Sequence, residues 1–156
     1  MSDDARFEDG SETPLNLGAL DEDDLKVISS LTQDAVFTVA DMTWRAGEHR
    51  LAILINRFRW EDDGRDRHGA ERVRSLLVID NVLGVSSQGV DRKEKDTILS
   101  VLSLTFEPGE DGAGYVVLTL AGDGAIRAEA EALEVNLRDV TRPYKAVSGK
   151  APDHGD

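Results

Sequence analysis

The chain has 156 residues, no cysteine and a formal net charge of −13. This length predicts one domain that can bury its own core, and the lack of cysteine excludes disulfides, thiolate nucleophiles and cysteine-bound zinc. An acidic body repels polyanions, and the chain has no apolar run of the roughly 20 residues that a membrane helix needs. We therefore expect a cytoplasmic protein that has no nucleic-acid partner and no membrane partner.

Composition divides the chain into three parts. Residues 1–14 are acidic and polar, and we expect them to be disordered. Residues 15–141 contain the regular apolar patterns and are expected to form a single domain. Residues 142–156 contain Pro and Gly and are expected to form a flexible C-terminal tail.

Two elements are predicted at the start of the domain. Residues 15–20 are typical of a short edge strand. A helix is expected from about residue 22 to 32, because Asp21 can cap its first amides and three acidic residues lie beside the positive end of the helix dipole. Apolar residues follow at helical spacing, namely Leu25, Ile28 and Leu31. The acidic residues therefore have a structural role in our interpretation, in preference to metal binding.

From residue 35 onward the apolar residues alternate, which is typical of strands joined by Gly-containing turns. About seven antiparallel strands are predicted, at residues 35–44, 49–60, 71–80, 81–90, 96–108, 115–122 and 126–130. The segment at about residues 130–140 fits a helix and a strand equally well. We favour a helix there, because Ala, Glu and Leu dominate and a closing helix would cover the open end of a sheet.

This order of elements predicts an α+β fold, with an antiparallel β-barrel or two-sheet core and an N-terminal and a C-terminal helix. Seven meandering strands closed by a C-terminal helix resemble the pleckstrin-homology-like superfold, which is an analogy of fold alone. The side chains expected in the core are Ile53, Ile55, Phe58, Trp60, Leu77, Ile79, Leu102, Leu104, Phe106, Leu118 and Leu120.

No catalytic or metal-binding pattern is visible in the sequence. The three histidines, His49, His68 and His154, are isolated from one another, and no Ser or Gly motif has the spacing of a nucleophile elbow or a phosphate-binding loop. We therefore predict no catalytic residue, no metal ligand and no cofactor, and we expect the protein to bind neither zinc nor nucleotide. This favours a protein that is not an enzyme, although catalytic groups can also meet only in three dimensions.

The stretch NRFRWEDDGRDRHGAERVR at residues 56–74 contains six of the 18 Lys and Arg residues. Strand alternation predicts that Arg57 and Arg59 face solvent while Phe58 and Trp60 face the core. Basic and aromatic side chains would then lie on opposite faces, which disfavours base stacking and nucleic-acid binding. Two alternatives remain, an anion-facing surface or internal ion pairs with the acidic residues of the same stretch. These acidic residues are Glu61, Asp62, Asp63, Asp66 and Glu71.

The candidate binding surface combines three segments of the chain. If the strands at residues 49–60 and 71–80 pair, facing side chains lie roughly 5 Å apart, and their arginines could form one cluster with the basic loop that follows. Arginine suits such a surface because its planar guanidinium pairs with carboxylate or phosphate through two hydrogen bonds. The predicted anion- or partner-binding residues are Arg57, Arg59, Arg72, Arg74, Arg92, Lys93 and Lys95.

A resemblance to an uncharacterised bacterial family, domain of unknown function 2948, is carried by four segments over about residues 15–141. They are LDEDDLKVISSLTQDAV, NRFRWE, RVRSLLVIDNVLGVSSQGVDRKEKDTILSVLSLTFEPGE and LTLAGDGAIRAEAEALEVNLRDV. The family is found mainly in alphaproteobacteria and has no assigned reaction, cofactor or catalytic residue. The resemblance therefore implies a bacterial cytoplasmic protein of one compact domain, and it assigns no functional residue.

The function that we predict is a non-enzymatic binding or scaffolding domain whose ligand is a protein partner or a small anion. The alternative is an enzyme that acts on a small anionic substrate at a site assembled only in three dimensions. A deep pocket with converging titratable groups of perturbed pKa would favour the enzyme. A third reading, an oligomerising structural protein, would be favoured by a wide apolar patch or an open strand edge.

Overall fold

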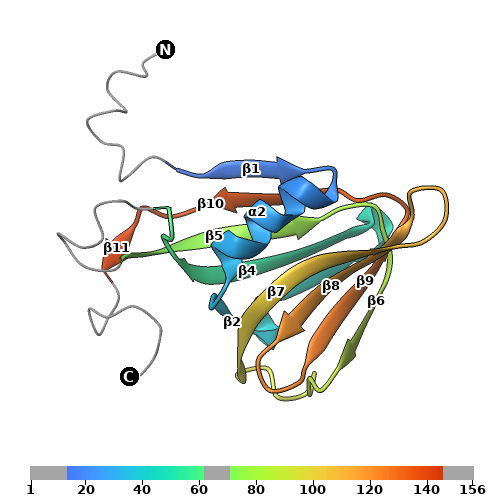
Figure 1. Ribbon diagram of the computed structural model, residues 1–156. Helices are drawn as coiled ribbons and strands as arrows, with labels where there is room; N and C mark the ends of the chain where they lie inside the picture. Colours follow the sequence, from blue (N-terminus) through green and yellow to red (C-terminus); the bar gives the residue numbers. More distant parts are fainter. Residues whose placement is uncertain (1–13, 62–70, 146–156) are drawn as a thin grey trace, which may run out of the picture.

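The computed structural model describes residues 14–61 and 71–145. Within these ranges the chain forms one α-helix, two 3-10 turns and eleven strands, and each strand pairing is antiparallel (Figure 1). The strands are β1 (Asn16–Ala19), β2 (Val36–Thr38), β3 (Met42–Arg45), β4 (Arg50–Phe58), β5 (Glu71–Ile79), β6 (Val82–Gln88), β7 (Ile98–Pro108), β8 (Gly114–Leu120), β9 (Ala125–Ala130), β10 (Val135–Asp139) and β11 (Tyr144–Lys145). The helix is α2 (Glu22–Thr32), and the 3-10 turns are η2 (Val39–Asp41) and η3 (Ala46–Glu48).

The strands form one curved sheet in the order β1-β10-β5-β4-β2-β7-β8-β9-β6, while β11 adds to β5 and β3 adds to β4. Strand β2 joins the two halves of the sheet, because it pairs with β4 on one side and with β7 on the other. The two outermost strands of the order, β1 and β6, do not pair with each other, so the described sheet is not closed into a barrel. The α+β class is confirmed in this coarse form.

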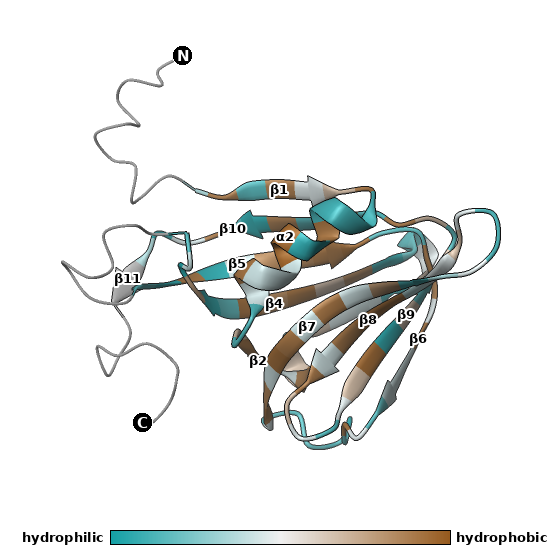
Figure 2. Cartoon of the chain, in the orientation of Figure 1, coloured by the Kyte–Doolittle hydropathy of each residue, from teal (hydrophilic) through white to brown (hydrophobic). Residues whose placement is uncertain are grey.

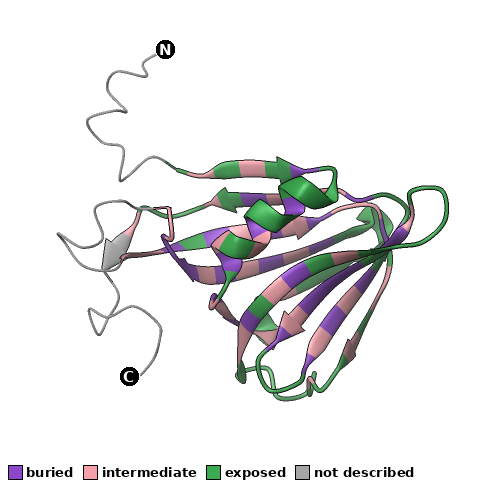
Figure 3. Ribbon diagram, in the orientation of Figure 1, coloured by how far each residue is buried: buried purple, intermediate pink, exposed green. Residues whose placement is uncertain are grey.

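Helix α2 lies against the inner face of the sheet, where it contacts β1, β4 and β7 (Figure 1). It begins where the sequence predicts, because the Asp21 carboxylate accepts a hydrogen bond of 2.8 Å from the Asp24 amide. Leu25 and Ile28 are buried against the sheet, and the opposite face of the helix is exposed (Figure 3). The amphipathic pattern therefore places the helix as a cover over one part of the core.

Buried and half-exposed side chains alternate along the strands, as the apolar positions do in Figure 2. Most of the predicted core residues are buried, whereas Trp60 and Phe106 are half-buried. Leu102 was expected in the core and is 47% exposed, so that prediction is wrong. The register between β7 and β8 shifts between Val101 and Ser103. Such a bulge reverses the alternation, which buries Val101 in place of Leu102.

The C-terminal helix expected at about residues 130–140 is also wrong, because β10 occupies this segment. Strand β10 lies between β1 and β5 and pairs with both. These two strands present backbone groups that need hydrogen-bond partners, and that tertiary requirement outweighs the helix propensity of Ala, Glu and Leu. The pleckstrin-homology-like analogy, which depended on a closing helix, is not confirmed.

The ends of the chain belong only in part to the described structure. Strand β11 extends the sheet into the segment expected as a C-terminal tail and pairs with the beginning of β5. The rest of that tail (146–156), residues 1–13 of the segment expected to be disordered (1–14), and residues 62–70, which include Asp62, Asp63 and Asp66, lie outside the described residues. No helix in the described ranges has the length and apolarity needed to cross a membrane.

Candidate functional site

The sequence assigned Arg57 and Arg59 to the solvent face of their strand, and the structure shows that this assignment is wrong. Their side chains are 0% and 3% exposed. On β4 the inner face is set by Leu51, Ile53 and Ile55, and strict alternation continues this face to position 57. Arg57 therefore points inward, although it is fully charged.

The buried guanidinium of Arg57 is surrounded by oxygen atoms. It donates to both carboxylate oxygens of Glu61 at 2.9 and 2.8 Å and to Asp139 Oδ1 at 2.9 Å. Its Nε donates to Ser75 Oγ at 2.9 Å, and the Ser75 hydroxyl in turn donates to Asp139 Oδ1 at 2.7 Å. We call these four residues the interior cluster. It connects β4, β5 and β10 at one end of the sheet, and it engages the Arg57 guanidinium in hydrogen bonds within the protein.

Charge pairing in the interior cluster outweighs the cost of burial. Burial by itself would lower the pKa of Arg57, but hydrogen bonds and attraction to Glu61 and Asp139 raise it. Burial would likewise raise the pKa of Glu61, yet the hydrogen bond and charge of Arg57 hold it below its ordinary value of 4.5. Both groups are therefore kept ionised, which leaves neither available for proton transfer near neutral pH.

The strands that carry the other predicted arginines do pair, but the arginines do not gather into one cluster. Arg72 lies opposite Phe58 on the outer face, with its guanidinium carbon 4.0 Å from the Phe58 ring centre. Arg59 forms an ion pair with Glu71, at 2.5 Å between Nη1 and Oε1. Arg74 is exposed on the outer face of β5. Internal ion pairing, the second alternative from the sequence, therefore accounts for the two inward-facing arginines, with Glu61 and Glu71 as partners.

The remaining predicted cations follow β6 in the loop at residues 89–97. Arg92 and Lys95 line an apolar cleft of about 400 Å³ between β3 and β6, whereas Lys93 is exposed and does not line it. We call this concavity the seam cleft; its apolar walls are Met42, Trp44, Leu51, Val85, Val90 and Ile126. The structure thus places two of the seven predicted residues in the interior, two on the outer face of β5, two at the seam cleft and Lys93 on the exposed loop, and their role in binding stays a prediction.

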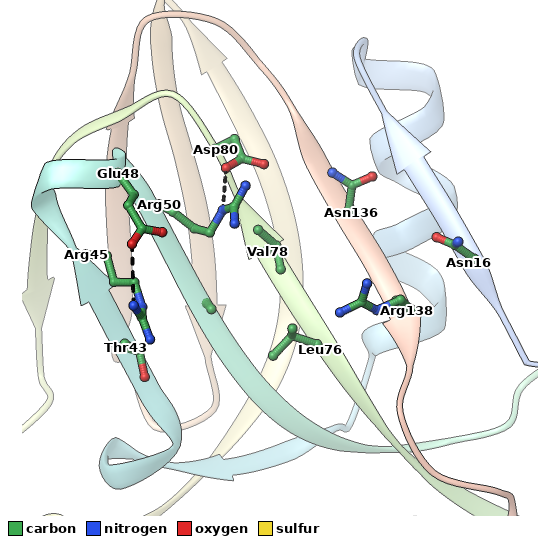
Figure 4. Close-up of a pocket in the computed structure, with 11 residues that line it drawn as sticks. Asn16, Thr43, Arg45, Glu48, Arg50, Leu76, Val78, Asp80, Asn136 and Arg138 are labelled. Atoms are coloured by element: carbon green, nitrogen blue, oxygen red, sulfur yellow. Dashed lines mark hydrogen bonds and ion pairs between the residues drawn. The ribbon is translucent and has the colours of Figure 1, made fainter.

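A second concavity, of about 540 Å³, lies on the outer face of the first half of the sheet (Figure 4). We call it the outer hollow; the residues that shape it include Thr43, Arg45, Arg50, Ala52, Val78, Asp80, Asn136 and Arg138. The strand register explains its form. Asn136, Val78, Ala52 and Thr43 follow one another across β10, β5, β4 and β3, and these short side chains make a low floor between longer ones.

Three arginines border this floor. Arg45 pairs with Glu48 at 3.4 Å, and Arg50 Nε pairs with Asp80 at 2.7 Å. The hydrogen bond and charge of Asp80 raise the pKa of Arg50 above its ordinary value. Arg138 is exposed, and within the described residues its side chain forms no hydrogen bond or ion pair. In Figure 4 the guanidinium groups of Arg50 and Arg138 extend from opposite sides toward the middle of the hollow.

An amide completes this side of the hollow. Asn136 lies beside Gly18 of β1, where a Cβ atom would come within 2.9 Å of Asn136 Oδ1. Because residue 18 is glycine, the side-chain oxygen of Asn136 can lie close to β1. The side-chain nitrogen of Asn136 then points toward the hollow (Figure 4). The outer hollow therefore offers two guanidinium groups and one amide donor on rigid strands.

Comparison with known proteins places the chain in one family. The family described as "Protein of unknown function (DUF2948)" matches residues 15–154. The chain belongs to this family. The resemblance seen in the sequence is thus confirmed, and the match extends beyond residue 141 into the C-terminal segment. No curated protein and no solved structure matches the chain.

In this DUF2948 protein the outer hollow was not predicted from the sequence. Its arginines come from three separate strands and stand alone in their segments, so local density of basic residues does not reveal them. The signal that could have found Arg50 and Arg138 is strand parity, since both occupy outward positions of strands whose inward positions begin with aliphatic residues, Leu51 and Ile53 on β4 and Val135 and Leu137 on β10. Placing them together also required the register of three strands.

Proposed function

We propose that the protein is a non-enzymatic binding domain that holds a small organic anion in the outer hollow. The observation that carries this proposal is the pair of guanidinium groups, Arg50 and Arg138, that extend from opposite sides over Val78 (Figure 4). A guanidinium binds carboxylate or phosphate in a planar, two-pronged geometry and is always protonated. The two groups together suit an anion with two acidic ends or one oxygen-rich group.

Charge favours a small anion over a long one. The chain has a net charge of −13, so a polyanion would be repelled over its whole length. A small anion needs only the local surface, where three arginines face two carboxylates, Glu48 and Asp80. Both of these carboxylates are already paired with Arg45 and Arg50. Arg138 is therefore the residue expected to bind the ligand most directly.

The chemistry of the outer hollow favours binding over catalysis. Arginine does not lose its proton at physiological pH and cannot act as a general base. The two carboxylates that line the hollow are held in ion pairs with arginines. The alternative, an enzyme acting on a small anionic substrate, would require a base directed at the bound anion, and both carboxylates of the hollow are already engaged in these pairs.

The experiment is a titration followed by nuclear magnetic resonance with three probes: succinate, citrate and inorganic phosphate. We expect saturable shifts of the backbone amides of Asn136, Arg138 and Arg50 with at least one probe. Charged hydrogen bonds contribute about 1.5–3 kcal/mol each, so Arg138→Gln should weaken binding by about tenfold or more.

Arg127→Gln is the control, because Arg127 is an arginine whose side chain is 43% exposed, pairs with Glu107 and lies on β9 outside the hollow. It should leave the affinity unchanged. Equal loss of affinity in Arg127→Gln and Arg138→Gln, or no saturable shift with any probe, would contradict the proposal. Chemical conversion of a bound probe would favour the enzyme.

A further inference from the structure

The seam cleft is where the apolar interior reaches the surface. Met42 and Trp44 of β3 lie opposite Ile53 and Leu51 of β4, so they share the inner face of the sheet. Helix α2 packs on β1, β4 and β7 and covers the interior elsewhere. Between β3 and β6 there is no strand pairing among the described residues. The cleft is therefore an opening into the core at the unclosed edge of the sheet.

Its apolar walls are continuous with the core. Leu51 and Ile126, which line the cleft, are 1% and 2% exposed, whereas Trp44 is 37% exposed. We interpret the first two as the floor and Trp44 as part of the mouth. A volume of about 400 Å³ lies within the range of small-molecule sites, roughly 300–1,000 Å³. Such sites combine apolar walls with a few convergent polar groups, and they often lie in the mouths of β-barrels.

The charged side chains that line the cleft are all positive. The loop at residues 89–97 carries three acidic and three basic residues, yet the charged residues that line the cleft are Arg92 and Lys95, both cations. The acidic residues of this loop, Asp91, Glu94 and Asp96, do not line it.

Neighbouring elements hold the backbone at Lys95 and the side chain of Arg92. The Lys95 carbonyl accepts a hydrogen bond of 3.2 Å from the Ala40 amide of η2, which ties the loop to the opposite wall. Arg92 Nε donates to Ser87 Oγ of β6 at 3.3 Å, which holds its guanidinium beside the cleft. A ligand with one anionic end would meet both cations while its apolar part lies on the floor.

We propose that the seam cleft binds a single-chain amphiphile with one acidic head group, of the class of medium-chain fatty carboxylates. The chain lies against Leu51 and Ile126, and the carboxylate lies between Arg92 and Lys95. The site is separate from the outer hollow, since β3 presents Met42 and Trp44 to the cleft and Thr43 and Arg45 to the hollow. Ligand binding at one site can therefore be disproved without affecting the proposal for the other.

Trp44 provides the signal for the test. The chain has two tryptophans, and Trp60 packs near Phe58 away from the cleft. In a Trp60→Phe background, decanoate below its micelle concentration should change the Trp44 fluorescence saturably and shift it to shorter wavelength. Burial of methylene groups strengthens binding by roughly tenfold for each pair, so octanoate should bind about tenfold more weakly than decanoate.

Three variants in this background separate the head group from the chain. Lys95→Gln should weaken decanoate binding by about tenfold and leave decanol binding unchanged, because only decanoate carries a charge. Val85→Phe should reduce binding of both ligands by filling the cleft. Lys93→Gln is the matched control, a cation of the same loop that does not line the cleft, and it should bind decanoate normally.

Several outcomes would overturn the proposal. These are an absence of saturable fluorescence change with decanoate, an equal effect of Lys95→Gln on decanoate and decanol, and an equal effect of Lys93→Gln and Lys95→Gln. Both lysine variants are surface changes, so they test the proposal even if Val85→Phe does not fold. A failure of the succinate, citrate and phosphate titrations would leave these fluorescence results unaffected.

Discussion

The interior cluster and the outer hollow are both built from β4 and β10, but on opposite faces of these strands. On β10, Asp139 faces inward and accepts from Arg57, while the preceding residue, Arg138, faces outward into the hollow. On β4, Arg57 faces inward and Arg50 faces outward. The inward arginine is enclosed by carboxylates and a hydroxyl, whereas Arg138 forms no ion pair within the described part of the chain. Whether the side chain of an arginine is exposed and unpaired therefore depends here on its strand parity and its acidic neighbours, and not on how many basic residues surround it in sequence.

The largest effect is expected from removing the inward cation. Arg57→Met leaves Asp139 and Glu61 without the charge that compensates them, and breaking a buried ion pair in this way costs about 3–5 kcal/mol. The measurement is the free energy of unfolding by chemical denaturation. Arg74→Ser, an exposed arginine on the adjacent strand, is the control and should stay within about 0.5 kcal/mol of the parent. A loss below about 1 kcal/mol for Arg57→Met would mean that the cluster is not energetically coupled.

An intermediate effect is expected from acid. The pKa of Glu61 is lower in the folded chain than its ordinary value of 4.5, because Arg57 stabilises the carboxylate. Its contribution to stability is therefore fully present above that value and is lost as the pH falls through the lowered pKa of the folded state. Glu61→Gln should flatten the decline of stability below pH 4.5.

The control for this pH dependence is the Arg57→Met background, in which the main cause of the lowered pKa is absent. There, Glu61→Gln should no longer flatten the decline of stability below pH 4.5, because the burial of Glu61 by itself raises its pKa. If the slope changes as much in that background as in the parent, Arg57 is not the source of the pKa shift.

The contrast between the interior cluster and the outer hollow shows which features could be predicted from the sequence. The helix was predictable because its signals are local, with a cap at Asp21 and apolar residues at helical spacing. The parity of β4 was also available, since Leu51, Ile53 and Ile55 define one face. Phe58 misled the assignment because it is buried too, but on the other face, beneath Arg72. An aromatic residue near the end of a strand therefore does not by itself mark the core face.

Other features depended on contacts between distant segments. One of the two carboxylates that compensate the buried Arg57 is Asp139, which lies 82 residues later and approaches it from β10. That same β10 was assigned to a helix, so its partners could not be inferred. The outer hollow likewise exists only once Asn136, Val78 and Ala52 are aligned across three strands. The seam cleft requires the sheet to remain open between β3 and β6, which no local pattern indicates.

The smallest effects on stability are expected at Arg138 and Asp139. These two residues are adjacent in β10 and face opposite sides of the sheet, so they compare the two regions most directly. Arg138→Ser removes an exposed cation with no partner in the described structure, so stability should stay within about 0.5 kcal/mol of the parent. The Asp139 side chain is 2% exposed and accepts hydrogen bonds from Arg57, Ser75 and the Leu15 amide. Asp139→Asn keeps its shape but removes its charge, and it should cost about 1–3 kcal/mol.

Anion titration should show the reverse order for these two substitutions. Arg138→Ser should weaken binding in the outer hollow, while Asp139→Asn, measured under conditions where it is fully folded, should leave the affinity unchanged because its side chain points away from the hollow. Equal effects of both substitutions on stability, or equal effects on affinity, would show that the two faces of β10 are not independent. Opposite effects would establish that adjacent residues of one strand divide charge between holding the fold together and binding a ligand.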